Sequence, residues 1–181
     1  MTLIFYKGNE RTFIMQIFFI FAEKYFMQLS EHIQNTETHQ FRMVFQNALN
    51  DNGNLFGGCA MQWMDEVAYI TAIRFTRMKV VTVVVGNLKF KKAIKMGEMV
   101  EIIGRVVKAG KVKIEIQVEI YVETRDSDHR EKAVEATFTF AAINDDYKPI
   151  CIDLNKHLNR DKYHRAAQKK IALTEFDHSF I

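Results

Sequence analysis

Proline is nearly absent from this sequence, and glycine and cysteine are scarce, so each occurrence is informative. The 181 residues include one proline, eight glycines and two cysteines. Cys59 and Cys151 lie far apart and fit neither a CxxC motif nor a Cys/His metal spacing, which argues against a zinc site and a disulfide. We therefore expect no metal, and two reduced thiols in a cytoplasmic protein.

Neither sign of charge dominates. The 25 basic and 22 acidic side chains leave a formal charge of only +3. This balance gives no case for nucleic-acid binding over the whole surface, so any anion-binding site must be local. Hydrophobic residues make up 48% of the chain, which is enough for the core of one compact domain.

The sequence also lacks an apolar run long enough to span a bilayer. Residues 13–22 (FIMQIFFIFA) form the apolar run near the start, but a transmembrane helix needs about 20 such residues. Glu23, Lys24 and Tyr25 follow where a secretory signal would have small residues. We expect no membrane partner, and the sequence favours Met27 as the natural start. Residues 1–26 are then an over-long reading frame or a loosely attached extension.

A predicted helix stands near the middle of the chain. Residues 40–46 alternate as a first strand, a polar turn follows, and the pair Gly57-Gly58 closes that turn. From Cys59 to Arg77 no helix breaker occurs, and apolar residues surround nearly the whole helical circumference. Such a pattern predicts a helix that is buried on all sides.

Beyond Lys79 the hydrophobic period changes from about 3.6 to 2, which indicates strands. The predicted strands cover residues 80–92, 98–108, 112–122 and 133–143. One strand, a buried helix and four long antiparallel strands predict an α+β fold in which a sheet wraps around one helix. We expect an N-terminal extension over 1–37, this domain over 38–150, and a basic, partly helical tail over 151–181.

Asp65 is the unusual residue of the predicted helix, because it stands among apolar neighbours. A buried carboxylate costs several kcal/mol unless it is paired or used in chemistry, and burial tends to raise its pKa. The structural alternative is that Asp65 lies on a narrow polar stripe or caps a neighbouring loop. Gly57 and Gly58 either make a tight turn or let a ligand approach the free N–H groups at the helix start, which would stabilise an oxyanion.

Two further groups have both a structural and a functional interpretation. Cys59 is either a small buried residue or a nucleophile activated by the helix start, although no histidine is near it in sequence. The lysines are either a solvated surface or a phosphate-binding rim on two neighbouring strands. They are Lys89, Lys91, Lys92 and Lys95, with Lys108, Lys111 and Lys113 on the next hairpin.

Several blocks resemble the hotdog acyl-CoA thioester hydrolases. Residues 50–58 (NDNGNLFGG) and 63–68 (WMDEVA) resemble the family's turn and helix motif. Residues 81–83 (VTV), 90–94 (FKKAI) and 96–98 (MGE) resemble its next block, and residues 135–140 (EATFTF) its closing strand. The resemblance covers about residues 40–150, and several blocks in the right order are more specific than one.

The resemblance implies a helix wrapped by an antiparallel sheet, edge-to-edge dimers and a hexameric trimer of dimers. It assigns Asp65 as base or nucleophile, Asn50 as a residue acting from the other protomer, and Gly57 and Gly58 as carbonyl-binding backbone. Lys91, Lys92 and Lys111 are expected to contact CoA, which is part of the substrate, and no cofactor is implied. One departure is Lys92-Ala93, where the family usually has Arg-Pro; lysine keeps the charge but loses bidentate phosphate recognition.

The sequence leaves two alternatives to a hydrolase. A non-catalytic acyl-CoA-binding sensor would bind without turnover. An acyl-thioester dehydratase or hydratase would typically use a histidine, and residues 40–124 contain none.

Overall fold

The computed structural model of this chain describes residues 10–124 and 129–153. The elements in chain order are α1 (Glu10–Thr36), β1 (Thr38–Met43), the short 3-10 helix η1 (Gln46–Ala48), α2 (Gly57–Thr76), β2 (Val80–Phe90), β3 (Met99–Ala109), β4 (Lys113–Glu123) and β5 (Arg130–Ala142). Most of the expected tail, residues 154–181, lies outside the described residues.

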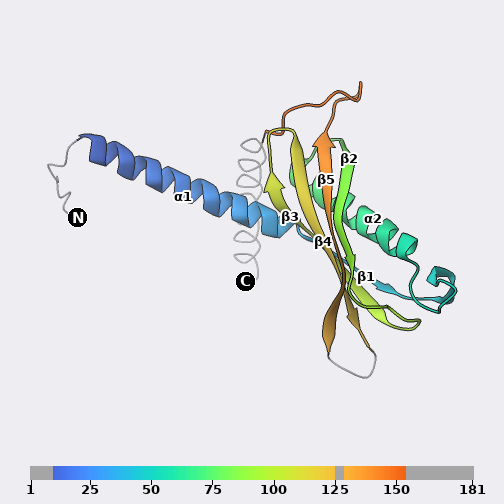
Figure 1. Ribbon diagram of the computed structural model, residues 1–181. Coiled ribbons are helices and arrows are strands. Elements are labelled where there is room, and N and C mark those ends of the chain that lie inside the picture. The colour runs from blue at the N-terminus through green and yellow to red at the C-terminus, as the bar shows by residue number, and fades with distance from the viewer. Residues whose placement is uncertain (1–9, 125–128, 154–181) are drawn as a thin grey trace, which may run out of the picture.

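One antiparallel five-stranded sheet curves around α2 (Figure 1). Its strand order is β1-β3-β4-β5-β2, and neighbouring strands are antiparallel. β4 shows why the sequence folds this way: its isoleucines and valines are buried toward the core, while the residues between them are only half-buried. The predicted α+β arrangement, a sheet around one helix, is confirmed.

Helix α2 and the sheet approach closely at Gly104 of β3. A Cβ atom at this position would lie 2.6 Å from the Thr71 hydroxyl oxygen and 2.9 Å from a Val67 methyl carbon. The α2 face that includes Val67 and Thr71 is fully buried. Glycine is therefore needed here because the helix occupies the space that a side chain would fill.

The opposite face of α2 is not buried in a single chain. Tyr69 and Ile70 are about two-fifths exposed, at 43% and 42%, and Gln62 and Asp65 are exposed as well. The prediction of a helix buried on all sides is therefore wrong for one chain. The sequence pattern predicts that the apolar residues of this face belong to the core, but no element among the described residues covers them.

Strand β2 forms an edge of the sheet. It pairs with β5, and its register is interrupted between Thr82 and Val84 and again between Gly86 and Lys89. Val83, Val84 and Val85 are all exposed. An apolar edge strand of this kind is a ready template for pairing with another chain.

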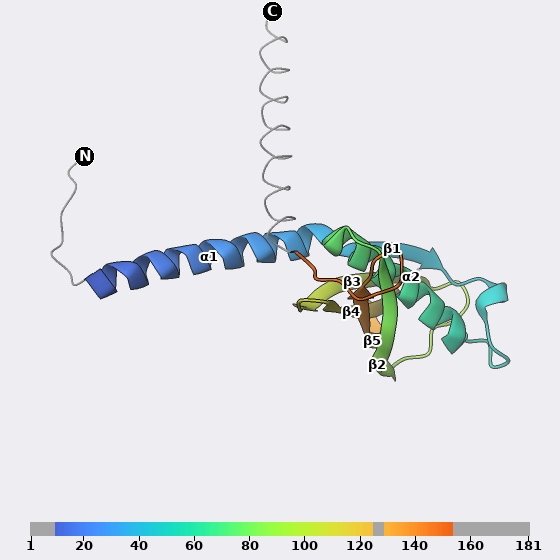
Figure 2. The ribbon, with the colours of Figure 1, turned by 90° about the horizontal axis from the view of Figure 1, so that it is seen from above.

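Helix α1 was not predicted from the sequence. Its C-terminal end packs on the domain, where His32 Nε2 donates to the Phe75 carbonyl oxygen at 3.0 Å and Arg74 donates to the carbonyl oxygens of Asn35 and Glu37. The rest of the helix extends away from the sheet (Figures 1 and 2). Among the described residues, no helix combines the length and the apolar character needed to cross a membrane.

A charged network links the junction of α1 and β1 to strands β3 and β5. His39 contacts Glu101 through Nδ1 at 2.6 Å and Glu37 through Nε2 at 2.9 Å. Arg105 pairs with Glu37, and Arg130 pairs with Glu101. Glu37 and Glu101 are therefore each held by one nitrogen of His39 and by one arginine guanidinium.

Candidate active site

A cleft of about 380 Å³ opens beside the start of α2. The polar turn before α2, the first turn of α2 and the segment after β2 supply most of its walls. The lining residues are Asn50, Asn54, Leu55, Gly57, Ala60, Phe90, Lys91, Lys92, Ala93, Ile94 and Val134. Four of the residues predicted for the site, Asn50, Gly57, Lys91 and Lys92, thus line one cavity.

The turn before α2 fixes the orientation of Asn50. Its side-chain oxygen accepts hydrogen bonds from the backbone N–H groups of Asn52 at 3.0 Å and Asn54 at 3.1 Å. Gly53 completes the turn with a φ of +73°, a conformation that favours glycine. Because the oxygen is used by the turn, the side-chain NH₂ group of Asn50 is the part that can donate to a ligand.

The glycine pair has a steric reason as well as a chemical one. A Cβ atom at Gly57 would lie 3.3 Å from the Phe90 ring, and one at Gly58 would lie 2.5 Å from the Phe56 ring. Phe56 is the N-cap of α2 and makes no side-chain capping hydrogen bond. The first N–H groups of the helix therefore have no capping side chain and have the positive end of the helix dipole behind them. Gly57 lines the cleft and Gly58 does not.

Asp65 lies elsewhere on α2 and does not line the cleft. It follows Gly57 by eight residues, which is about 12 Å along a helix. Its Oδ1 accepts a hydrogen bond of 3.3 Å from the Thr82 hydroxyl on edge strand β2. The expectation that Asp65 is surrounded by apolar side chains is wrong for a single chain, because the side chain is exposed on the uncovered face of α2.

Lys91 and Lys92 contribute positive charge to the cleft, but both are paired. Lys91 Nζ lies 2.8 Å from Glu135, and Lys92 Nζ lies 2.6 Å from Glu131. The hydrogen bond with Glu131 raises the pKa of Lys92, and the one from Lys91 lowers the pKa of Glu135. Glu135 also lies near two more lysines, Lys89 at 3.5 Å and Lys132 at 3.6 Å, so this carboxylate is shared among three ammonium groups.

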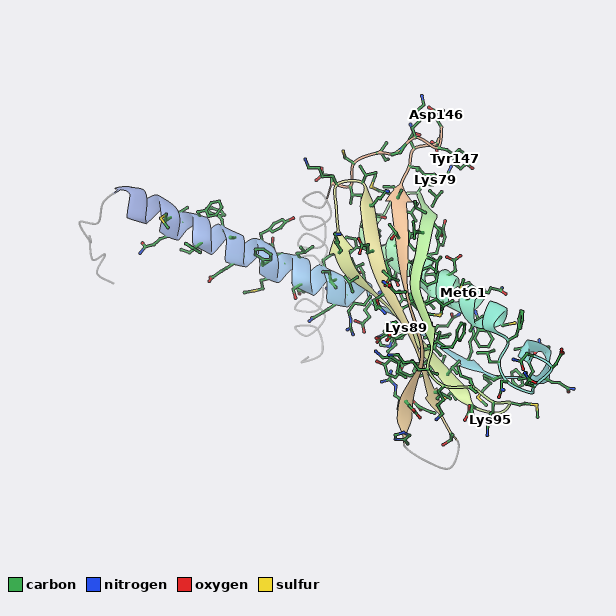
Figure 3. All side chains as sticks on the ribbon, in the orientation of Figure 1. Met61, Lys79, Lys89, Lys95, Asp146 and Tyr147 are labelled. Carbon is green, nitrogen blue, oxygen red and sulfur yellow. The ribbon has the colours of Figure 1, made fainter. Side chains whose placement is uncertain are left out.

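Lys111 is remote from this cleft within one chain. Its carbonyl oxygen accepts a hydrogen bond from the Ile152 N–H group. The next residue, Val112, accepts one from Ala142, and Ala142 pairs with Val80, the first residue of β2. Lys111 therefore lies at the end of the sheet where β2 begins. Lys91 and Lys92 follow the last residue of β2, at the opposite end of the sheet; Figure 3 labels Lys79 and Lys95 at these two ends. The prediction of one rim on neighbouring strands is wrong, because β5 and β4 separate β2 from β3.

Cys59 is half-buried and packs against the hydrophobic core, as the structural interpretation predicts. Cys151 is exposed. Among residues 10–124 and 129–153 no group of three or more His, Cys, Asp or Glu side chains is arranged to hold a metal ion.

Two residues of the site region were not singled out from sequence. Thr82 was noted only as part of the VTV block, and Phe90 only as part of FKKAI. Their roles follow from position: Thr82 stands beside Asp65, and Phe90 covers Gly57. No pattern within a single strand could have shown these contacts, because they join residues 17 and 33 positions apart.

Comparison with known proteins identifies the family. The Thioesterase superfamily profile matches residues 52–128. The chain is 37% identical over 103 residues to the acyl-CoA thioester hydrolase YciA of Salmonella typhimurium, and this match covers 55% of the chain and 77% of the relative. The chain belongs to the acyl-CoA thioester hydrolase family.

Solved structures of hotdog thioester hydrolases share the fold. An acyl-CoA hydrolase from Staphylococcus aureus, solved with butyryl coenzyme A and coenzyme A, has a TM-score of 0.64 at 26% identity, covering 81% of this chain and 94% of its own. The hexameric thioesterase y2039 from Yersinia pestis has a TM-score of 0.59 at 32% identity, covering 63% of this chain and 93% of its own. The resemblance drawn from the sequence motifs is confirmed, both for the family and for the hotdog fold.

Proposed function

We propose that this chain hydrolyses acyl-CoA thioesters at a site shared by two copies of itself. The observation that carries the proposal is the division of the site within one chain. Asn50 and Gly57 line a cleft. Asp65 lies outside it, on the uncovered face of α2, and is hydrogen-bonded to Thr82 of edge strand β2. A second chain paired along β2 would bring its own Asp65 toward the first chain's cleft, and would cover the exposed apolar side chains.

The substrate would enter by its thioester carbonyl. The N–H groups of Gly57 and Gly58 and the NH₂ group of Asn50 would donate to the carbonyl oxygen. Lys91 and Lys92 would meet phosphate groups of the CoA portion, exchanging part of their pairing with Glu135 and Glu131 for it. Lys111 would contribute only if another copy brought it near, since it lies at the far end of its own sheet.

The chemical step needs a base and a stabilised oxyanion. The partner's copy of the Asp65 carboxylate would take a proton from water as the water oxygen attacks the carbonyl carbon. The oxyanion would then collapse, break the carbon–sulfur bond and expel the CoA thiolate, which takes the proton back from the aspartic acid. The products are a carboxylic acid and free CoA. In the direct alternative, the carboxylate itself attacks the carbonyl carbon and expels the CoA thiolate, forming a mixed anhydride that water then hydrolyses; water attack on the aspartyl carbon of this anhydride would leave oxygen from heavy-oxygen water in the Asp65 side chain after one turnover.

We further propose that no metal or redox cofactor takes part, since a carboxylate base and backbone donors suffice for this chemistry. Hydrolysis unaffected by a chelator would support this. The assembly we propose is a trimer of edge-to-edge dimers, a hexamer like that named for the Yersinia pestis thioesterase. A dehydratase is not favoured, because His39 is engaged by Glu37 and Glu101 and does not line the cleft.

The test is release of free thiol from a panel of short-chain to long-chain acyl-CoAs. Wild type should release CoA, and Asp65→Asn should lower kcat by about 10²–10⁴-fold while the variant stays folded. Asp146→Asn is a matched control, because it makes the same chemical change at an exposed turn that lies outside the cleft. Binding of acyl-CoA by wild type without any thiol release would instead identify a sensor.

A further inference from the structure

The cleft beside α2 has a polar rim and a hydrocarbon base. The lining residues that are buried are all apolar, and each is at most 9% exposed: Leu55, Ala60, Ile94 and Val134. The lining residues with amide or ammonium groups are half-buried or exposed: Asn50, Asn54, Lys91 and Lys92. The polarity of the cleft therefore falls from its mouth to its base.

The backbone N–H groups at the base are already used within the fold. The Leu55 N–H donates to the Ile94 carbonyl oxygen at 2.7 Å, and the Ala60 N–H donates to the Phe56 carbonyl oxygen at 3.1 Å. A polar group of a ligand that reached the base would lose its water and meet side chains that cannot form hydrogen bonds. A hydrocarbon chain carries no such cost and gains free energy from burial.

Ala60 lies where an acyl chain would enter this base. It follows Gly57 by three residues, so the two positions lie on the same side of α2, about 4.5 Å apart along the helix axis. A thioester carbonyl bound at the Gly57 N–H would direct the first carbons of its acyl chain over Ala60. The Ala60 side chain is a single methyl group, and a larger side chain there would fill the base.

We propose, resting on the function proposed above, that the base of this cleft selects unsubstituted aliphatic acyl chains and that Ala60 sets the longest chain that fits. Chains that end in a carboxylate are poor substrates, because the base would leave that group without water and without a partner. Ala60 is thus a specificity-determining residue rather than a catalytic one.

Chain-length preference tests the role of Ala60. Thiol release gives kcat/KM for octanoyl-CoA and for acetyl-CoA, and the ratio of the two is compared between variants. Ala60→Leu should lower this ratio at least about tenfold, since a single methylene in an apolar pocket is worth roughly 10–200-fold. Ala60→Val should fall between Ala60→Leu and the wild type. Ala109→Leu is the matched control: it adds the same group at a half-buried position outside the cleft and should change the ratio by less than about twofold.

A comparison within the wild type tests the selection of aliphatic chains and needs no variant to fold. Hexanoyl-CoA and adipoyl-CoA have six-carbon acyl chains, but the adipoyl chain ends in a carboxylate. The wild type should favour hexanoyl-CoA by at least about 10²-fold in kcat/KM, because an ionised carboxylate without a partner is costly to bury. Equal use of the two substrates would overturn the proposed selection.

The other outcomes are equally distinct. An octanoyl-to-acetyl ratio in Ala60→Leu equal to that of the wild type, with circular dichroism showing a folded variant, would overturn the role of Ala60. If the wild type releases no thiol, titration calorimetry with the same ligands gives the ratios as affinities. The predicted ratios in binding without turnover would refute hydrolysis and support the acyl-chain site, whereas absence of these preferences would overturn that site.

Discussion

In the proposed function, Asp65 is a base that is oriented before its site is complete. Its carboxylate is exposed in one chain, yet Oδ1 already accepts a hydrogen bond from Thr82. Thr82 lies on edge strand β2, so pairing of that edge with another chain would exclude water from both residues. In the proposed function Thr82 is a positioning residue: its hydrogen bond orients Asp65, and it does not need to touch the substrate.

Replacing Thr82 with valine should lower kcat by about fivefold, the rate equivalent of one ordinary hydrogen bond of about 1 kcal/mol, with KM little changed. Steady-state kinetics of thiol release measures both constants. Thr82→Ser keeps the hydroxyl and should restore kcat. An equal loss in the serine variant would show that the methyl group matters and not the hydrogen bond.

His39 predicts a pH dependence of stability. Hydrogen bonds with Glu101 and Glu37 raise the pKa of His39 above its ordinary 6.5. The Arg105 bond lowers the pKa of Glu37 below 4.5; for Glu101, burial opposes ionisation, but the bonds from His39 and Arg130 outweigh it and lower its pKa. The stabilisation from protonated His39 is thus complete below pH 6.5 and is lost as pH rises through its raised pKa. The stabilisation from the Glu37 and Glu101 carboxylates is lost in the other direction, as pH falls through their lowered pKa values.

The free energy of unfolding of the wild type should therefore exceed that of the His39→Gln variant. The difference should be largest between pH 4.5 and 6.5 and should shrink at higher pH. We expect about 1 kcal/mol at most, because the His39 side chain is 43% exposed and exposed ion pairs are screened. Urea unfolding at several pH values measures the difference. A difference that grows above neutral pH would contradict the network as described.

At the scale of elements, the period of apolar residues was enough to predict the strands and α2. The predicted strand 112–122 and helix Cys59–Arg77 fall within two residues of β4 and α2 at each end. Burial was predicted less well, because Ile70 and its neighbours on α2 look like core in sequence and are open in one chain. Helix α1 was missed because residues 13–22 were interpreted only against a membrane span and a secretory signal, and residues 1–26 were taken as an over-long reading frame or an extension.

The contact between α2 and β3 depends on Gly104. A methyl group there would meet Thr71 and Val67 at distances below 3.0 Å, so Gly104→Ala should cost about 1–3 kcal/mol through overpacking. Urea unfolding measures this cost. Val107→Ile is the control, because it adds one methyl group at an exposed position of the same strand and should be nearly neutral. Equal stability of the two variants would mean that the helix can shift to accommodate the methyl group.

At the scale of the whole molecule, the sequence could not show how the predicted site residues are divided. Asn50, Gly57 and Lys91 share a cleft, but Asp65 lies outside it beside β2, and in the proposed function a second chain joins the two groups. Sequence spacing along α2 places Asp65 two turns from Gly57 but gives no information on a partner. The family resemblance assigned Asn50 to the other protomer, and the geometry of one chain gives a physical reason for that division.

The shared site is tested most directly with a mixed dimer. One chain carries Asn50→Ala and the other Asp65→Asn, and different tags allow hexamers that contain both chains to be purified after co-expression. A site that takes Asn50 from one chain and Asp65 from its partner leaves one of the two sites of each mixed dimer intact. If the chains pair at random, half of the dimers are mixed, so we predict about a quarter of the wild-type thiol release from acyl-CoA, while each parent variant alone is nearly inactive. A mixed hexamer as inactive as its parents would contradict the shared site.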